Sequence, residues 1–323
     1  MNKKMSVFLG NTVVIFCVLL FMAIIFTGCV STKTGTPIQA MEYQLFNSTF
    51  GKYSANVAME KMPEAILVYK TEKSVYTCEW GEKFAQRLGL FRGCYKTNGG
   101  FYINETIYGG RSVDVRSDIG LIRFSDLGRK DNYPDKDKPV NLPPDDQVIR
   151  NVTDFLMSQN LLFTDAVFRG ISFVELEHRN ESNRKEITRG SKFVSFDRTL
   201  NSRRVVGSKI RVEVGENFDI LDIWINWRNY TPYKEAPLRS VESAFEEFTT
   251  RELWCSGFSG SSDNVTVTNV TLVYYSQVPA AAGNEKYLQP VYVFESIAKQ
   301  GNKTSSCTPL SVPATVERFE ETY

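Results

Sequence analysis

The chain has 323 residues, of which 42% are hydrophobic, 23% charged and 13% aromatic. This composition is typical of a globular protein with a sizeable core, and the length suits two domains. The formal net charge of +1 argues against a nucleic-acid partner, because phosphate binding needs a basic excess.

The N-terminus has the pattern of an export signal. Lys3 and Lys4 precede an apolar run over residues 13–26, and Thr27-Gly28-Cys29 follows it. At about 14 residues, the run is shorter than the roughly 20 that a membrane-spanning helix needs. We therefore predict a signal peptide over residues 1–28 and a lipid on the thiol of Cys29.

Residues 29–42 are polar and predict a lipid-anchored tether. Phe26 stands where lipoprotein signals usually carry leucine. A second interpretation therefore stays open, in which Cys29 carries no lipid and residues 7–30 remain as an uncleaved signal anchor. Both interpretations place the chain at the cell membrane, facing the extracytoplasmic side.

The remaining cysteines predict disulfide bonds. Cys17 is lost with the signal, and four cysteines follow Cys29. An even number in an exported chain favours disulfides over buried free thiols, although four cysteines allow three pairings. Proximity in sequence favours Cys78 with Cys94 and Cys255 with Cys307.

Asn-X-Ser/Thr sites are unusually frequent, and such sites mark exposed positions in exported proteins. A lipid anchor with glycosylation would suit an archaeal envelope. A bacterium without any glycosylation, in which these sites are only polar loops, is the alternative. The eight candidate glycosylation sites are Asn47, Asn104, Asn151, Asn180, Asn229, Asn264, Asn269 and Asn302.

A first module is predicted over residues 43–125. Residues 65–69 are a short apolar strand, and residues 79–88 place Trp80, Phe84 and Leu88 on one face of a helix. Short strands are predicted to follow, ending near residue 124. Residues 126–145 contain four prolines and many charges without apolar periodicity, which predicts a linker.

A second, larger domain is predicted over residues 146–323. Its first helix begins near Asp146, with Asp145 or Asp146 as the cap. Strands follow, and the alternation over residues 220–228 places Trp227 on the apolar side. Another helix is predicted after Ser240, followed by two further strands.

The same order of elements recurs three times, with helices beginning near Glu79, Asp146 and Ser240. Each helix has one apolar face and precedes two to four strands that can pair antiparallel. The predicted fold class is therefore α+β, with helices packed on antiparallel sheets in two domains.

No catalytic or metal site is predicted. His178 is the single histidine, and zinc sites need several ligands. Gly257-Phe258-Ser259-Gly260 is one residue short of a nucleophile elbow and lies in a loop rich in Ser and Gly. Five aspartates could offer oxygen ligands to calcium, but their spacing does not match a calcium loop: Asp131, Asp135, Asp137, Asp145 and Asp146. We therefore expect no enzyme activity and no cofactor.

Aromatic residues are dense in the second half of the chain. Strand alternation predicts that about half of them are core residues, and the others could form a surface for a ligand or partner. The candidate binding residues are Trp224, Trp227, Tyr230, Tyr274 and Tyr292.

Three segments carry a resemblance to a known family: residues 206–214 (VGSKIRVEV), residues 236–245 (APLRSVESAF), and residues 270–275 with 288–294 (VTLVYY, LQPVYVF). Residues 205–297 resemble the YycI/YycH and YpeB-like proteins with PepSY-type domains, in which a helix packs on a small antiparallel sheet. Those relatives are usually held by a transmembrane helix, whereas in this chain the apolar run ends at Cys29.

The resemblance implies extracytoplasmic regulation through protein–protein contact, without catalytic residues. We expect a lipid-anchored binding or regulatory protein with an envelope protein as its partner. A solute- or carbohydrate-binding lipoprotein is the alternative. A deep apolar pocket lined by Trp and Tyr would favour the alternative, and a flat surface with an exposed sheet edge would favour the first function.

Overall fold

The computed structural model of the chain describes residues 52–55, 57, 62–106, 109–130, 140–179, 185–256, 264–277 and 285–319. The predicted signal peptide, Cys29, the tether, Asn47, Asn180 and residues 131–139 of the predicted linker lie outside these ranges. The described residues from Lys52 to Phe319 belong to one compact unit. They form a mixed helix and strand fold in which strands dominate, in agreement with the coarse prediction.

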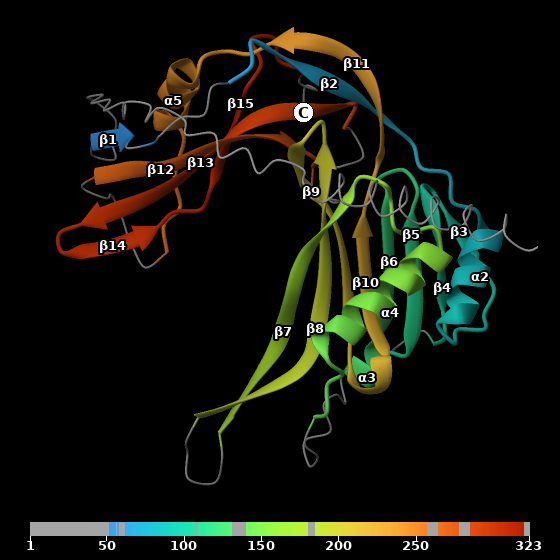
Figure 1. The fold of residues 1–323 in the computed structure, drawn as a ribbon. Coiled ribbons are helices and arrows are strands. Elements are labelled where there is room, and N and C mark those ends of the chain that lie inside the picture. Colours follow the sequence, from blue (N-terminus) through green and yellow to red (C-terminus); the bar gives the residue numbers. More distant parts are fainter. Residues whose placement is uncertain are drawn as a thin grey trace, which may run out of the picture. The chain divides into compact units, whose positions relative to one another are not determined.

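The largest part of the fold is an antiparallel sheet of eight strands (Figure 1). The three-residue strand β3 lies at one edge and the long strand β7 at the other. From edge to edge, the strands are β3 (Tyr95–Thr97), β4 (Gly100–Asn104), β5 (Arg111–Arg116), β6 (Leu121–Asp126), β10 (Ile220–Asn226), β9 (Arg203–Val214), β8 (Lys185–Leu200) and β7 (Ala166–Arg179).

Two helices cover one face of this sheet, α2 (Cys78–Arg87) and α4 (Asp145–Ser158) (Figure 1). Their apolar faces bury Phe84 from α2 and Leu156 from α4 in one core with the inward residues of the strands. Thr77 caps α2 by accepting a hydrogen bond from the Trp80 backbone N–H. The α2 prediction is confirmed to within one residue at each end.

The predicted cap of α4 is wrong. Pro144 is the residue before the helix, and no side chain caps it. Asp145 and Asp146 instead lie in the first turn, where their charges favour the positive end of the helix dipole.

The second part of the fold has its own core, to which α5 (Val241–Thr249) contributes Phe245 and Phe248. Ser240 caps α5 through the Ser243 N–H, as predicted. The central strands of this second part follow the order β11-β2-β13-β12. Strand β1 pairs with β12, and strands β14 and β15 pair with β13. These strands are β11 (Asn229–Pro237), β2 (Ala65–Glu72), β13 (Tyr287–Gln300), β12 (Asn264–Tyr275), β1 (Lys52–Ala55), β14 (Lys303–Ser306) and β15 (Leu310–Pro313).

Strand β9 joins the two parts because it changes partners along its length. Residues Val205 and Val206 pair with β12, and residues from Lys209 onward pair with β10. Gly207 lies between the two segments with φ +97°, and a Cβ there would lie 2.1 Å from the Ser276 carbonyl oxygen. Only glycine permits this approach, so Gly207 fixes the point where the sheet forks.

The two cores do not follow the order of the chain. β2, from the predicted first module, pairs with β11 and β13 in the second core. β6, also from that module, pairs with β10, which follows the predicted linker. Strands from the two predicted domains therefore pair with each other, and the division into two domains stays a prediction.

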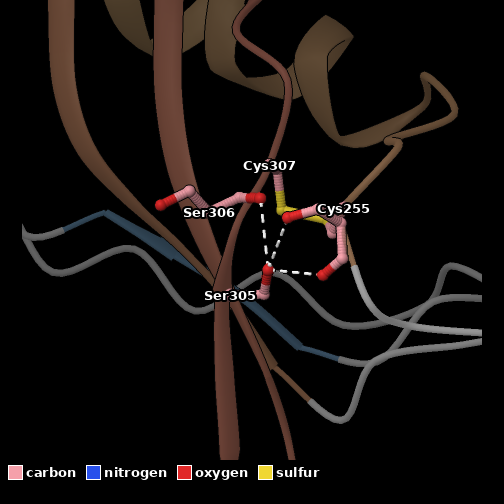
Figure 2. Close-up of a disulfide and its surroundings, with 5 residues drawn as sticks. Cys255, Ser305, Ser306 and Cys307 are labelled. Carbon is pink, nitrogen blue, oxygen red and sulfur yellow. Dashed lines mark hydrogen bonds between the residues drawn. A yellow bond between two sulfur atoms is a disulfide. The ribbon is translucent and has the colours of Figure 1, made fainter. Parts of the chain in front are cut away.

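Both disulfide pairings are confirmed: Cys78 with Cys94, and Cys255 with Cys307. Figure 2 shows the second bond, where Cys255 and Cys307 also face each other as an antiparallel bridge. Ser305 lies beside the bond, and its hydroxyl donates to the Ser256 carbonyl at 2.5 Å.

Candidate functional site

The five candidate binding residues do not form one surface. Trp227, Tyr274 and Tyr292 are at most 1% exposed and lie in the two cores, so the prediction that they belong to a binding surface is wrong. Trp227 follows the alternation of Ile223 and Ile225 into the first core, as the sequence predicted. The hydroxyls of Tyr274 and Tyr292 donate to the Leu67 and Arg239 carbonyls, which makes their burial possible.

Tyr230 belongs to a buried polar cluster where the two parts of the fold meet. Arg228 forms an ion pair with Glu285, and each side chain is 2% exposed. Arg228 also donates to the Ile119 and Gln277 carbonyls at 3.0 and 2.9 Å. The Tyr230 hydroxyl lies 3.0 Å from Glu285, and burial raises the pKa of this tyrosine. The groups satisfy one another, so this cluster is a structural joint.

Arg198 extends this cluster from β8. Its guanidinium donates to Asp165 at 2.6 Å and to the carbonyl of Arg228. It also lies over the rings of Trp227 and Tyr230, with its Cζ 4.9 and 4.6 Å from the ring centroids. No sequence motif indicated these charged residues, because their partners are distant in the chain.

The exposed edge of β7 is the first candidate binding surface. Among the described strands, β7 pairs only with β8. The register shifts at Phe168/Gly170 and at Val174/Glu175, which leaves residues 170–174 as a regular stretch between two irregularities. Val167 and Phe168 are 52% and 44% exposed. An edge with unpaired backbone groups and exposed apolar side chains can accept another strand.

A hollow of 770 Å³ lies against the same hairpin. It is open and lined by Phe173 and Glu175 of β7, by Ile187 and Arg189 of β8, and by residues near the start of α4. Arg189 lies over the ring of Phe173, with its Cζ 4.2 Å from the centroid. Lys192 is buried at the wall and donates to Asp145 at 2.5 Å and to the Pro143 carbonyl at 2.6 Å.

A second hollow of 520 Å³ lies where the C-terminus of α2 meets the β4–β5 turn. Its charges are largely paired with one another. Arg111 binds both oxygens of Glu105, and Arg129 lies 2.8 Å from Asp219. The hydrogen bonds from the Arg111 backbone and side chain hold the pKa of Glu105 below its ordinary value. The hollow is therefore polar, and these ion pairs leave it without a strong charge of one sign.

Trp224 lies on the face of the eight-stranded sheet opposite α2 and α4. It is half-buried and packs on Ile119 and Leu121. In the strand register, Arg123 of β6 and Arg211 of β9 lie directly on either side of it. The alternation of β10 places Trp224 on the opposite side from Trp227. The arginines that flank Trp224 depend on strand order, which the sequence did not indicate.

Few of the residues considered for metal binding or catalysis lie in the part of the chain that the structure describes. The described part of the chain contains no group of three or more His, Cys, Asp or Glu side chains placed to hold a metal ion. The backbone of His178 lies in β7 opposite Glu186, and its side chain is outside the described set. Residues 257–260 are also outside it.

Six of the eight candidate glycosylation sites are described. Five are exposed, and Asn104 at the end of β4 is half-buried. This exposure agrees with the expectation for acceptor sites, and glycosylation itself stays a prediction. The exposed five are Asn151, Asn229, Asn264, Asn269 and Asn302.

Within the ranges that the structure covers, no helix has both the length and the apolar character needed to cross a bilayer. No family model matches the chain, and no curated protein matches it. The fold is similar to the crystal structure of an uncharacterized protein from Eubacterium rectale, with a TM-score of 0.47 and 11% sequence identity over 87% of this chain and 94% of that one.

Proposed function

We propose that this chain is a lipid-anchored binding or regulatory protein of the cell envelope, which acts by protein–protein contact and without catalysis. The observation that carries the proposal is the edge of β7, where residues 170–174 have no second strand partner among the described residues. An extended segment of an envelope protein would pair with this stretch and add a strand to the sheet.

The hollow beside β7 supports the same mechanism. In strand addition, backbone hydrogen bonds provide affinity and pockets for alternate side chains provide specificity. The hollow has apolar walls at Phe173 and Ile187 and charges at Glu175 and Arg189. It could therefore hold one amphipathic side chain of the incoming segment.

Three further features support the location. The export pattern that ends at Cys29, the two disulfide bonds and the exposed Asn-X-Ser/Thr sites are each typical of extracytoplasmic proteins. The resemblance of residues 205–297 to the YycI/YycH and PepSY-type proteins agrees with a regulatory contact at the outer face of the membrane. In this proposal Cys29 attaches the chain to the membrane, and no nucleic acid is involved.

A pair of proline substitutions tests the edge. Successive backbone N–H groups of an edge strand point alternately toward the neighbouring strand and toward solvent. Of Ile171→Pro and Ser172→Pro, we therefore expect one variant to keep its stability and lose the partner, and the other to be destabilised. Proline has no backbone N–H. Where that N–H points to solvent, proline removes only the donor that a partner strand would use, and at the other position it removes a hydrogen bond to β8.

The measurement is photo-crosslinking in the native membrane from position 174, with position 153 on α4 as the control. We expect a crosslinked partner from position 174 that disappears in the stable proline variant. A partner that crosslinks equally in both proline variants, or equally from position 153, would contradict docking at β7.

A further inference from the structure

Three cations surround Trp224 on the open face of the eight-stranded sheet. Arg123 and Arg211 are its direct neighbours on β6 and β9, and Lys209 lies two residues before Arg211, opposite Asn226. We call Arg123, Lys209, Arg211 and Trp224 the cationic face. Arg123 and Lys209 are exposed, and Arg211 and Trp224 are half-buried.

The geometry of the sheet keeps these side chains together. The strand neighbours of each residue, such as Ile122, Ile210 and Ile223, are buried in the first core. Alternation therefore directs the cationic face to the opposite side of the sheet. Trp224 also rests on Ile119 and Leu121, which are 3% and 8% exposed.

No carboxylate among the described residues forms an ion pair with the three cations of the cationic face. The two arginines instead approach aromatic rings. The Arg123 Cζ lies 5.4 Å from the centroid of Trp224, and the Arg211 Cζ lies 4.0 Å from that of Phe193. A guanidinium over a ring keeps its N–H edge available for hydrogen bonds to a ligand.

The carboxylates farther along this face already have cationic partners. Glu213 and Asp222 share Lys130, at 2.8 and 3.2 Å. Asp118 pairs with Arg116 at 3.2 Å.

Two more aspartates lie across from the cationic face in the strand register. Asp197 lies opposite Lys209 and pairs with Arg204 at 2.9 Å. Asp114 lies opposite Arg123, and its charge offsets part of that arginine's charge without a direct ion pair. One carboxylate against three cations leaves a local positive excess in a chain whose net charge is only +1.

We propose that the cationic face binds an acidic polysaccharide, with the arginines bound to uronic carboxylates and the exposed part of Trp224 in contact with a sugar ring. Guanidinium groups bind carboxylates through two parallel hydrogen bonds, so they recognise the acid groups specifically. Trp224 is half-buried, and the part of its ring that Ile119, Leu121 and Arg123 leave exposed offers an apolar contact for the C–H groups of a sugar.

The shape of the face favours a polysaccharide over an acidic protein segment. Protein interfaces depend on apolar anchors that fill desolvated pockets. Both hollows are lined by residues outside the cationic face. An acidic polysaccharide has a carboxylate on each uronic residue and can bind through ion pairs, so it does not require the deep aromatic pocket expected for an uncharged carbohydrate. This site is independent of the proposed contact at β7, from which β8 separates it.

The test measures binding of oligogalacturonate to the full-length chain in a neutral detergent by isothermal titration calorimetry. The comparison ligands are the methyl-esterified oligomer, which lacks the charge, and poly-L-glutamate, which has the charge without the sugar. The variants are Arg123→Gln and Arg211→Gln, with Arg150→Gln on α4, over the opposite face, as the matched control. Circular dichroism confirms that each variant folds.

We expect oligogalacturonate to bind and the methyl ester not to bind. Each of the first two variants should weaken binding roughly tenfold, and Arg150→Gln should leave it unchanged. The stable β7 proline variant should bind the oligomer normally, which separates this result from the proposed function. Absence of binding, an equal loss in Arg150→Gln, or equal affinity for poly-L-glutamate would each overturn the proposal.

Discussion

Among single residues, Glu285 supplies the negative charge that balances buried Arg228 at the joint between the two parts. It pairs with Arg228 where both side chains are 2% exposed, and it also accepts from Tyr230. Glu285→Gln would leave the guanidinium buried without a counter-charge. We expect the free energy of unfolding to fall by about 3–5 kcal/mol, as for other broken buried pairs.

Urea unfolding of Glu285→Gln and of a control variant measures this effect. Asp146→Asn breaks an exposed helical pair with Arg150 and should change stability little. If the two variants lose similar stability, the Arg228 site is hydrated in solution.

Residue-level prediction from the sequence succeeded where a short local pattern decided the outcome. Alternation placed Trp227 on the apolar side, and proximity in sequence paired the cysteines correctly. It failed for the binding surface, because Trp227 packs inside the first core and Tyr274 and Tyr292 pack inside the second. It could not find Arg228 with Glu285, since the pairing depends on how distant strands meet.

Two structural elements are held by disulfide bonds that close loops of different length. The bonds span 16 and 52 residues. In the chain-entropy model, the longer loop restricts the unfolded chain more, so its bond stabilises more. We expect Cys255→Ser with Cys307→Ser to lower the free energy of unfolding by about 4 kcal/mol, and Cys78→Ser with Cys94→Ser by about 3 kcal/mol.

Urea unfolding of both double variants under non-reducing conditions checks this order. The wild-type protein with reductant serves as the control, because it should match the sum of the two losses if the sites are independent. A larger loss for the Cys78–Cys94 pair would contradict the loop-length argument.

Element prediction was most accurate for the three longer helices, and it missed the four-residue helix α3 (Leu127–Lys130), which begins in the predicted linker. α2 and α5 begin after Thr77 and Ser240, whose side chains provide local capping signals. The sequence indicated strands, but it did not indicate which strands pair with one another. The pairing of β2 with β11 joins residues about half the chain apart, and no local pattern encodes such a pair. The cationic face has the same origin, because it needs β6, β10 and β9 to be neighbours.

In the whole molecule, the interleaved strands couple the two cores. β9 pairs with strands of both parts, and β10 continues through Trp227 and Arg228 into β11. A change that loosens one core therefore also acts on the other. Half-buried Tyr76 in the first part, half-buried Tyr230 at the joint and buried Tyr274 in the second part make the stability of the fold respond to pH.

Burial raises the pKa of Tyr76 to about 12, and it also raises the pKa values of Tyr230 and Tyr274. In the unfolded chain a tyrosine titrates near pH 10. Above that pH, the unfolded state loses protons that the folded state retains, so stability falls as the pH rises. Below pH 9, both states keep these protons, and these tyrosines contribute no slope.

We expect the free energy of unfolding to decrease steadily from pH 10 to pH 11, with Tyr76 contributing about 1 kcal/mol of the decrease. Urea unfolding at half-unit steps from pH 8 to pH 11 measures the slope. Tyr76→Phe should make the slope above pH 10 shallower and leave the curve below pH 9 flat. The same slope in both proteins would show that Tyr76 ionises in the folded state, and that the packing of α2 on the sheet does not keep this hydroxyl from solvent.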